Sequence, residues 1–141
     1  MILHIFIFLL MLTSNPKQMH PSNEQITEAV QHYVTAGDQR NVESLDSILH
    51  PQFRVVANQL LGNSEVSIIT KDQYFQLILA GKLGGDNRTV EITSVQIIHN
   101  NAAVTVKLKG RALSFESLYH LIRINNTWQM VEDLPYAVKN N

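Results

Sequence analysis

Two side chains near the end of the sequence, Tyr119 and Glu132, form its clearest candidate acid–base pair. Asn125-Asn126 has the composition of a two-residue hairpin turn, because asparagine tolerates positive φ angles. Counting outward from this turn places Tyr119 opposite Glu132. A carboxyl group in an apolar pocket has a raised pKa, which suits proton abstraction, and a tyrosine hydroxyl can polarise a carbonyl. In the alternative interpretation Glu132 lies in water near a strand end, and Tyr119 only packs.

The same count divides this hairpin into two faces, because side chains alternate across a strand. One face is aromatic and, with two tyrosines from predicted helices, forms the expected ligand pocket: Tyr33, Tyr74, Phe115, Ser117, Tyr119, Trp128, Met130, Glu132 and Tyr136. The other face is also apolar and is the expected homodimer contact through the sheet: Leu118, His120, Ile122, Ile124 and Val131. This register places Asp133 on the second face, one row from His120.

Composition excludes several other chemistries. The chain has 141 residues and no cysteine, which excludes disulfides, thiolate metal sites and thiol nucleophiles. Its six histidines lack the spacing of metal-binding motifs, and its serines lack a GxSxG context. We therefore expect no metal and no cofactor. A net charge of −1 gives no general attraction to nucleic acid or to an anionic membrane.

The elements that must position these residues follow from periodicity and from turn signals. Helices are predicted over residues 22–37, 42–49 and 71–80, with capping boxes at Ser22 and Thr70 and a stop at His50-Pro51. Strands are predicted over residues 53–60, 65–69, 89–98, 102–109, 114–124 and 128–138, with a further turn at Asn100-Asn101. Helices segregated from a run of meandering strands indicate an α+β domain.

The first residues differ in character from the rest. Residues 1–14 include 11 hydrophobic residues and no charge, residues 15–21 form a polar linker with two prolines, and the domain is expected over 22–141. An 11-residue apolar helix rises about 16 Å, roughly half of a bilayer core, so no stable membrane span is expected. The length suits a signal peptide, which predicts export to the periplasm or beyond. An uncleaved anchor or a misassigned start codon is the alternative; without a signal, the protein is expected to be cytoplasmic.

Three stretches carry a resemblance to a known superfamily. They are ITEAVQHY at 26–33 with VESLDSILHP at 42–51, then TKDQYF at 70–75, and finally FESLYHLIRI at 115–124 with WQMV at 128–131. On these residues the chain resembles the nuclear transport factor 2-like (cystatin-like) superfamily over residues 24–138. More narrowly, it is similar to the bacterial proteins described as putative lumazine-binding and SnoaL-like. The resemblance implies a cone in which three helices pack on a curved antiparallel sheet of about six strands.

Three functions remain open at this point. The first is binding of a small apolar or aromatic ligand without chemistry. The second is an isomerase or cyclase that uses Glu132 and Tyr119. The third is a dimeric interaction domain whose cone is filled by its own side chains. In ketosteroid isomerases the base is an aspartate late in the first strand; the corresponding Ala57 and Asn58 cannot take a proton from carbon. A solvent-open cavity of about 300 Å³ or more would favour the two functions that need a ligand. A cone blocked by Tyr33, Tyr74 and Trp128 would favour the interaction domain.

Overall fold

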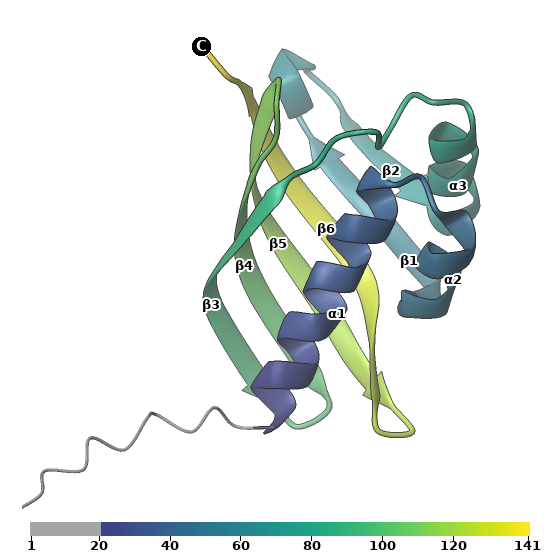
Figure 1. The fold of residues 1–141 in the computed structure, drawn as a ribbon, viewed down its shortest axis with the longest axis vertical. Helices are drawn as coiled ribbons and strands as arrows, with labels where there is room; N and C mark the ends of the chain where they lie inside the picture. The colour runs from purple at the N-terminus through teal and green to yellow at the C-terminus, as the bar shows by residue number, and fades with distance from the viewer. Residues whose placement is uncertain (1–20) are drawn as a thin grey trace, which may run out of the picture.

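The computed structural model describes residues 21–141, which form three α-helices, one short 3₁₀ turn and six strands (Figure 1). The elements are α1 (Pro21–Asp38), α2 (Val42–Ile48), β1 (Leu49–Asn58), η1 (Leu60–Gly62), β2 (Val66–Thr70), α3 (Lys71–Leu79), β3 (Thr89–Ile98), β4 (Asn101–Lys109), β5 (Leu113–Ile124) and β6 (Thr127–Lys139). The predicted α+β order is confirmed. The predicted signal peptide at 1–14 and most of the predicted linker at 15–21 lie outside the described residues.

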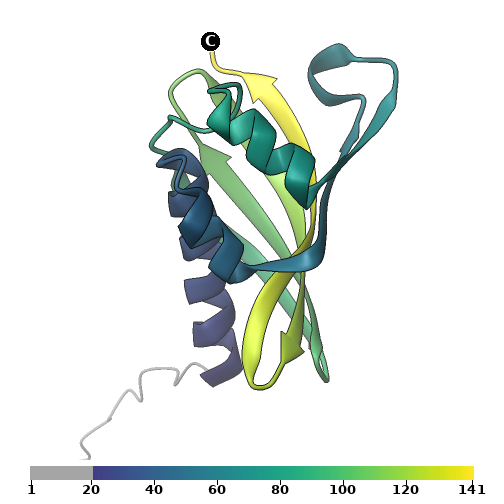
Figure 2. The same cartoon turned by 90° about the vertical axis from the view of Figure 1, so that its right-hand side faces the viewer.

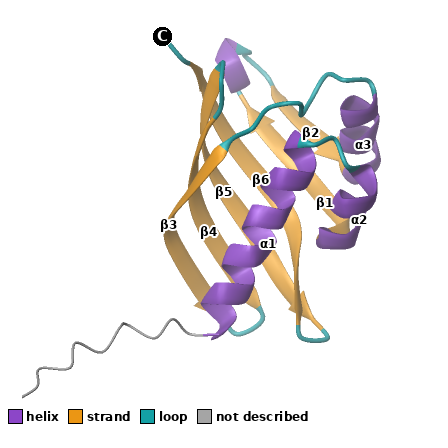
Figure 3. Cartoon of the chain, viewed as in Figure 1, coloured by secondary structure: helices purple, strands orange, loops and turns teal. Residues whose placement is uncertain are grey.

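The three helices lie on one side of the sheet, as Figures 1, 2 and 3 show. The predicted stripe of α1 is buried against the sheet, with Ile26, Val30 and Val34 almost fully covered. α1 packs against β6 and β3, and α3 packs against β1 and β2. No helix in the described part of the chain is long and apolar enough to cross a membrane.

The sheet has the strand order β2-β1-β6-β5-β4-β3. All neighbouring pairs are antiparallel except β1 and β6, which run parallel, so the sheet is mixed. The parallel pair sets Val55 of β1 beside Asp133 of β6. The last strand of the chain is therefore central in the sheet, and its side chains reach the interior of the cone.

A β-bulge in β6 changes the register expected for the β5–β6 hairpin. Asn125 and Asn126 form the predicted turn with positive φ angles of 50° and 62°, and the pairing holds as far as Leu121 opposite Met130. One extra residue in β6 then shifts the register, so that Tyr119 faces Asp133. The predicted pairing of Tyr119 with Glu132 is therefore wrong, because a bulge reverses which face the following residues occupy.

Three local boundaries also differ from the prediction. The β3–β4 turn begins one residue early, at His99, which adopts a φ of 53°. β1 begins at Leu49 and runs through His50-Pro51, where its register with β6 is irregular. α1 begins at Pro21, so Ser22 lies within its first turn.

The second predicted capping box is confirmed at the start of α3. The Thr70 hydroxyl accepts a hydrogen bond from the Gln73 backbone N–H at 3.3 Å, and the Gln73 side chain accepts one from the Thr70 N–H at 3.0 Å. These two contacts satisfy backbone donors that an isolated helix start would leave unpaired. They fix the helix that carries Tyr74 into the cone.

Replacing Thr70 by alanine should lower the free energy of unfolding by about 1 kcal/mol, because the cap is lost. Thr70→Ser keeps the hydroxyl and should stay close to the wild type. Urea denaturation of the three proteins measures the effect. Equal losses in the alanine and serine variants would mean that the methyl group, and not the cap, stabilises α3.

Candidate functional site

A cavity of about 290 Å³ lies inside the cone at the end where α1 finishes. Its walls come from α1, α3, the strands β1, β2, β4, β5 and β6, and the loop that joins α3 to β3. Most of the lining side chains are apolar or aromatic. They are Tyr33, Gly37, Asp38, Val55, Ala57, Leu60, Ile69, Tyr74, Lys82, Leu83, Gly84, Asp86, Arg88, Leu108, Ala112, Leu113, Phe115, Ser117, Tyr119, Asp133 and Pro135.

The polar centre of this cavity is a contact between Asp133 of β6 and Tyr33 of α1. The Tyr33 hydroxyl donates to Oδ2 of Asp133 at 2.8 Å. The Tyr33 ring also lies beside the Tyr74 ring of α3, with centroids 6.4 Å apart. Tyr33 thus links α1 to β6 by a hydrogen bond and to α3 by ring packing.

Asp133 is a buried carboxyl group that lacks a charged partner in direct contact. Its exposed fraction is 8%, and its Oδ1 atom has no hydrogen-bond partner among the described residues. Burial raises the pKa of Asp133 to about 7, although the Tyr33 hydrogen bond and the charge of Arg88 both act to lower it. Near neutral pH this group therefore exists in both its charged and its neutral forms.

The tyrosines around Asp133 remain neutral at every physiological pH. Burial and the nearby carboxylate raise the pKa of Tyr33 and of Tyr119 well above 10, and burial raises the pKa of Tyr74 to about 12. The Tyr33 and Tyr119 rings meet edge to face, with centroids 5.3 Å apart. Gly37 makes room for this cluster, because a Cβ there would stand 3.3 Å from the Tyr74 hydroxyl oxygen.

A second carboxylate, Asp38 at the end of α1, is fully paired. Its Oδ1 accepts from Nε of Arg88 at 2.7 Å, and its Oδ2 accepts from the Arg88 backbone N–H at 2.8 Å. The Arg88 guanidinium also lies 5.4 Å from the ring centroid of Phe115. Two acidic residues of the cavity wall therefore have different environments: Asp38 is neutralised by Arg88, and Asp133 is not.

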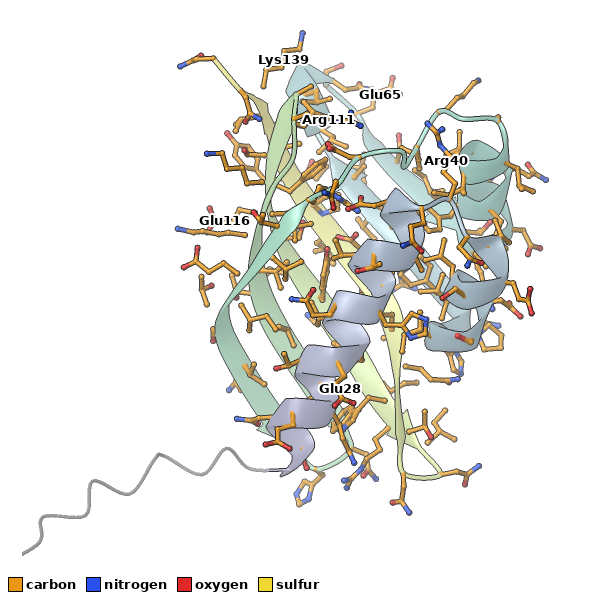
Figure 4. The ribbon with its side chains drawn as sticks, viewed as in Figure 1. Glu28, Arg40, Glu65, Arg111, Glu116 and Lys139 are labelled. Atoms are coloured by element: carbon orange, nitrogen blue, oxygen red, sulfur yellow. The ribbon has the colours of Figure 1, made fainter. Side chains whose placement is uncertain are left out.

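The loop at the mouth of the cavity is held by Arg40, which Figure 4 shows at this end of the molecule. Its side chain donates to the carbonyl oxygens of Leu83, Gly81 and Gly84 at 3.0, 3.2 and 3.3 Å. Gly84 has a φ of +77°, and a Cβ there would collide with the carbonyl oxygen of Gly37. Any other residue at position 84 would therefore push the loop away from α1.

The structure brings five of the nine predicted pocket residues to the cavity wall. These are Tyr33, Tyr74, Phe115, Ser117 and Tyr119. Met130 is buried in the core, and Tyr136 is 63% exposed because it follows the bulge. Trp128 is buried near the start of α1, with the Arg123 guanidinium 5.5 Å from its ring centroid. These last three do not line the cavity.

Glu132, the predicted base, also lies away from the cavity. It pairs across the sheet with His120, and its Oε2 lies 3.4 Å from Nδ1 of His120 and 3.6 Å from the Arg54 guanidinium. The bulge places Glu132 on the outer face of the sheet and turns Asp133 inward. The predicted neighbour of His120 was Asp133; in the structure it is Glu132.

Sequence reasoning missed Asp133, Asp38 and Arg88 as residues of the site. The only available signal for Asp133 was the Glu132-Asp133 dipeptide in a strand, where one of two adjacent acids must face inward. Asp38 is the last residue of α1 and Arg88 lies in the loop before β3, and periodicity does not predict the contacts of such positions. No cluster of potential metal ligands occurs among residues 21–141.

The outer face of the sheet carries the predicted dimer residues. Leu118 and Ile124 are exposed by 45% and 42%, whereas His120, Ile122 and Val131 are partly covered. The bulge adds Tyr136 to this face. The side of the sheet that faces away from the helices therefore exposes several large apolar side chains, beside the polar cluster of Glu132, His120 and Arg54.

Comparison with known proteins identifies both a family and a fold. The model of the family described as putative lumazine-binding matches residues 21–134. A search of curated proteins found no match.

Solved structures show the same fold at low sequence identity. A nuclear transport factor 2-like protein of unknown function from Shewanella baltica superposes with a TM-score of 0.73 at 12% identity, over 84% of this chain and 95% of that one. One from Silicibacter pomeroyi gives 0.70 at 16% identity, over 86% and 100%. A ketosteroid isomerase-like protein from Erwinia carotovora gives 0.68 at 15% identity, over 86% and 100%. The chain therefore has a nuclear transport factor 2-like, cystatin-like fold.

The raised pKa of Asp133 predicts a specific pH dependence of stability. Between about pH 4 and pH 7 the folded protein holds a proton on Asp133 that the unfolded chain has lost, so the free energy of unfolding falls as pH rises. Asp133→Asn should remove a slope of about 1.4 kcal/mol per pH unit in this window and should gain stability relative to the wild type as pH rises. Urea denaturation from pH 4.5 to pH 8 measures both proteins. Parallel profiles would show that Asp133 does not titrate in this range.

Proposed function

The chain belongs to the family described as putative lumazine-binding, and we propose that it binds a small apolar or aromatic molecule inside the cone without transforming it. The observation that carries this proposal is the cavity of about 290 Å³, whose wall has aromatic side chains and a buried carboxyl group, Asp133, that makes no ion pair among the described residues. Ligand pockets are mostly apolar, with a few polar groups that orient the ligand. The volume is just below the usual range of about 300 to 1,000 Å³, which favours a ligand of one or two rings.

The two alternatives are less well supported. The isomerase or cyclase mechanism needs Glu132 beside Tyr119, but Glu132 contacts His120 and Arg54 on the outer face. The filled cone needs the tyrosines to occupy the interior, but a cavity remains beside Tyr33 and Tyr74. Binding without chemistry requires only apolar walls and a polar group that orients the ligand, and the cavity has both.

Filling the cavity should abolish binding. Ser117 is buried on the cavity wall, so Ser117→Leu should weaken the binding of lumazine, the compound in the family's name, by about tenfold or more. Ser94 is an exposed strand residue, and Ser94→Leu is the matched control that should bind as the wild type does. Titration calorimetry measures the affinities, and native mass spectrometry of gently purified protein detects any retained molecule.

Two results would contradict the binding proposal. In the first, Ser117→Leu binds lumazine as tightly as the wild type, which would place the binding site elsewhere. In the second, lumazine does not bind and no small molecule is retained by the purified protein.

We also propose a homodimer through the outer face of the sheet. Leu118, Ile124 and Tyr136 are large apolar side chains that are exposed on this face. Apolar patches of this kind mark contact surfaces more often than free ones. The proposal concerns assembly and leaves the cavity unchanged.

Introducing a charge on this face should produce a monomer, because a buried unpaired carboxylate opposes association. Leu118→Glu is the test variant, and Leu79→Glu, on the exposed side of α3, is the matched control that should keep the wild-type assembly. Sedimentation velocity measures both. A wild-type protein that already sediments as a monomer would refute the proposal, as would an unchanged Leu118→Glu dimer.

A further inference from the structure

We infer that the cone selects molecules with a positively charged N–H group, such as a protonated amine or nitrogen heterocycle, which pairs with the Asp133 carboxyl group on the cavity wall. This inference rests on the proposed binding function and narrows it to a class of ligand. The two oxygen atoms of the Asp133 carboxyl group differ in their hydrogen bonds. Oδ2 accepts from Tyr33 at 2.8 Å, whereas Oδ1 has no partner among the described residues.

The charges of the cavity wall leave Asp133 as the uncompensated group. Arg88 is engaged by Asp38 through its side chain and its backbone N–H. At the mouth, Asp86 accepts from the Arg111 side chain at 3.3 Å, and Lys82 is exposed to solvent. No other described cation is in direct contact with Asp133, so the interior has a net negative charge whenever this carboxyl group is ionised.

The aromatic walls are also suited to an organic cation. The Arg88 guanidinium lies over the Phe115 ring, which shows that the lining accepts positive charge on an aromatic face. Tyr33 and Tyr119 stand beside Asp133 as neutral rings, because their hydroxyl groups do not ionise at physiological pH. The ring of a ligand with an ammonium group would thus pack against the aromatic side chains, and its ammonium group would pair with the Asp133 carboxylate.

Other ligand charges fit the cavity less well. An anion would stand beside the Asp133 carboxylate and be repelled, or it would require that group to remain protonated. A neutral molecule would form a hydrogen bond without neutralising the buried charge. A cationic donor forms a charge-assisted hydrogen bond, which is about twice as strong as a neutral one.

Three probes with one ring and different charges test this inference: benzylamine, benzyl alcohol and benzoate. At pH 8, where Asp133 is largely ionised, wild-type protein should bind benzylamine about tenfold more tightly than benzyl alcohol, and benzoate should bind weakest. Asp133→Asn should bring the benzylamine and benzyl alcohol affinities to within about threefold of each other. Ser94→Leu, at an exposed strand position outside the cavity wall, is the control that should keep the preference for benzylamine. Titration calorimetry measures all nine affinities.

A second measurement uses the wild type alone and does not depend on the folding of a variant. Benzylamine lowers the pKa of Asp133 when it pairs with the carboxylate, so binding at pH 6 should release a proton. Benzyl alcohol should release none. Calorimetry in two buffers with different ionisation enthalpies detects the proton.

The outcomes separate this inference from the proposed function. Benzyl alcohol binding as tightly as benzylamine, or benzylamine binding without proton release, would overturn the inference and leave the binding function intact. Failure of all three probes to bind would overturn the inference about the ligand's charge, but it would not test the proposed binding function. The lumazine and retained-molecule tests would then decide whether the cavity binds anything else.

Discussion

The hydrogen bond between Tyr33 and Asp133 is the contact on which the interior of the cone depends. A carboxyl group removed from water must be hydrogen-bonded, protonated or paired with a charge. Here Oδ2 accepts a hydrogen bond from the Tyr33 hydroxyl at 2.8 Å. Because the two side chains come from β6 and α1, this contact joins the sheet to the helix that covers it. The rings of Tyr74 and Tyr119 pack around Tyr33.

The bulge in β6 determines which acidic side chain of the strand faces Tyr33. Glu132 and Asp133 are adjacent, and the register shift sends the first to the outer face and the second into the cavity. The two environments give the acids opposite roles. Glu132 joins His120 and Arg54 in a partly exposed ionic cluster, whereas Asp133 remains unneutralised among tyrosines. Asp38, close by, is paired with Arg88, so of these two buried acids only Asp133 lacks an ion pair among the described residues.

Local signals predicted the elements well, and long-range geometry limited the prediction of the site. The spacing of Ile26, Val30 and Tyr33 and the capping box at Thr70 depend on neighbouring residues, and both appear in the structure as expected. A bulge leaves no mark in composition, so the register beyond it could not be derived. The displacement of Trp128 depends on where α1 crosses the sheet, and the parallel β1–β6 pair joins distant parts of the chain. The site residues that the sequence did not predict, Asp38, Arg88 and Asp133, also depend on contacts between distant parts of the chain.

The central position of β6 has a consequence for synthesis on the ribosome. β6 is the last element along the chain, yet it lies between β1 and β5 in the sheet. Until it emerges, β1 and β5 each present an unpaired edge, and the inner side of α1 lacks the strand against which it packs. Chains that lack β6 therefore expose apolar surface and open backbone together. The cavity, whose wall includes Asp133 and Pro135, forms only when β6 joins the sheet.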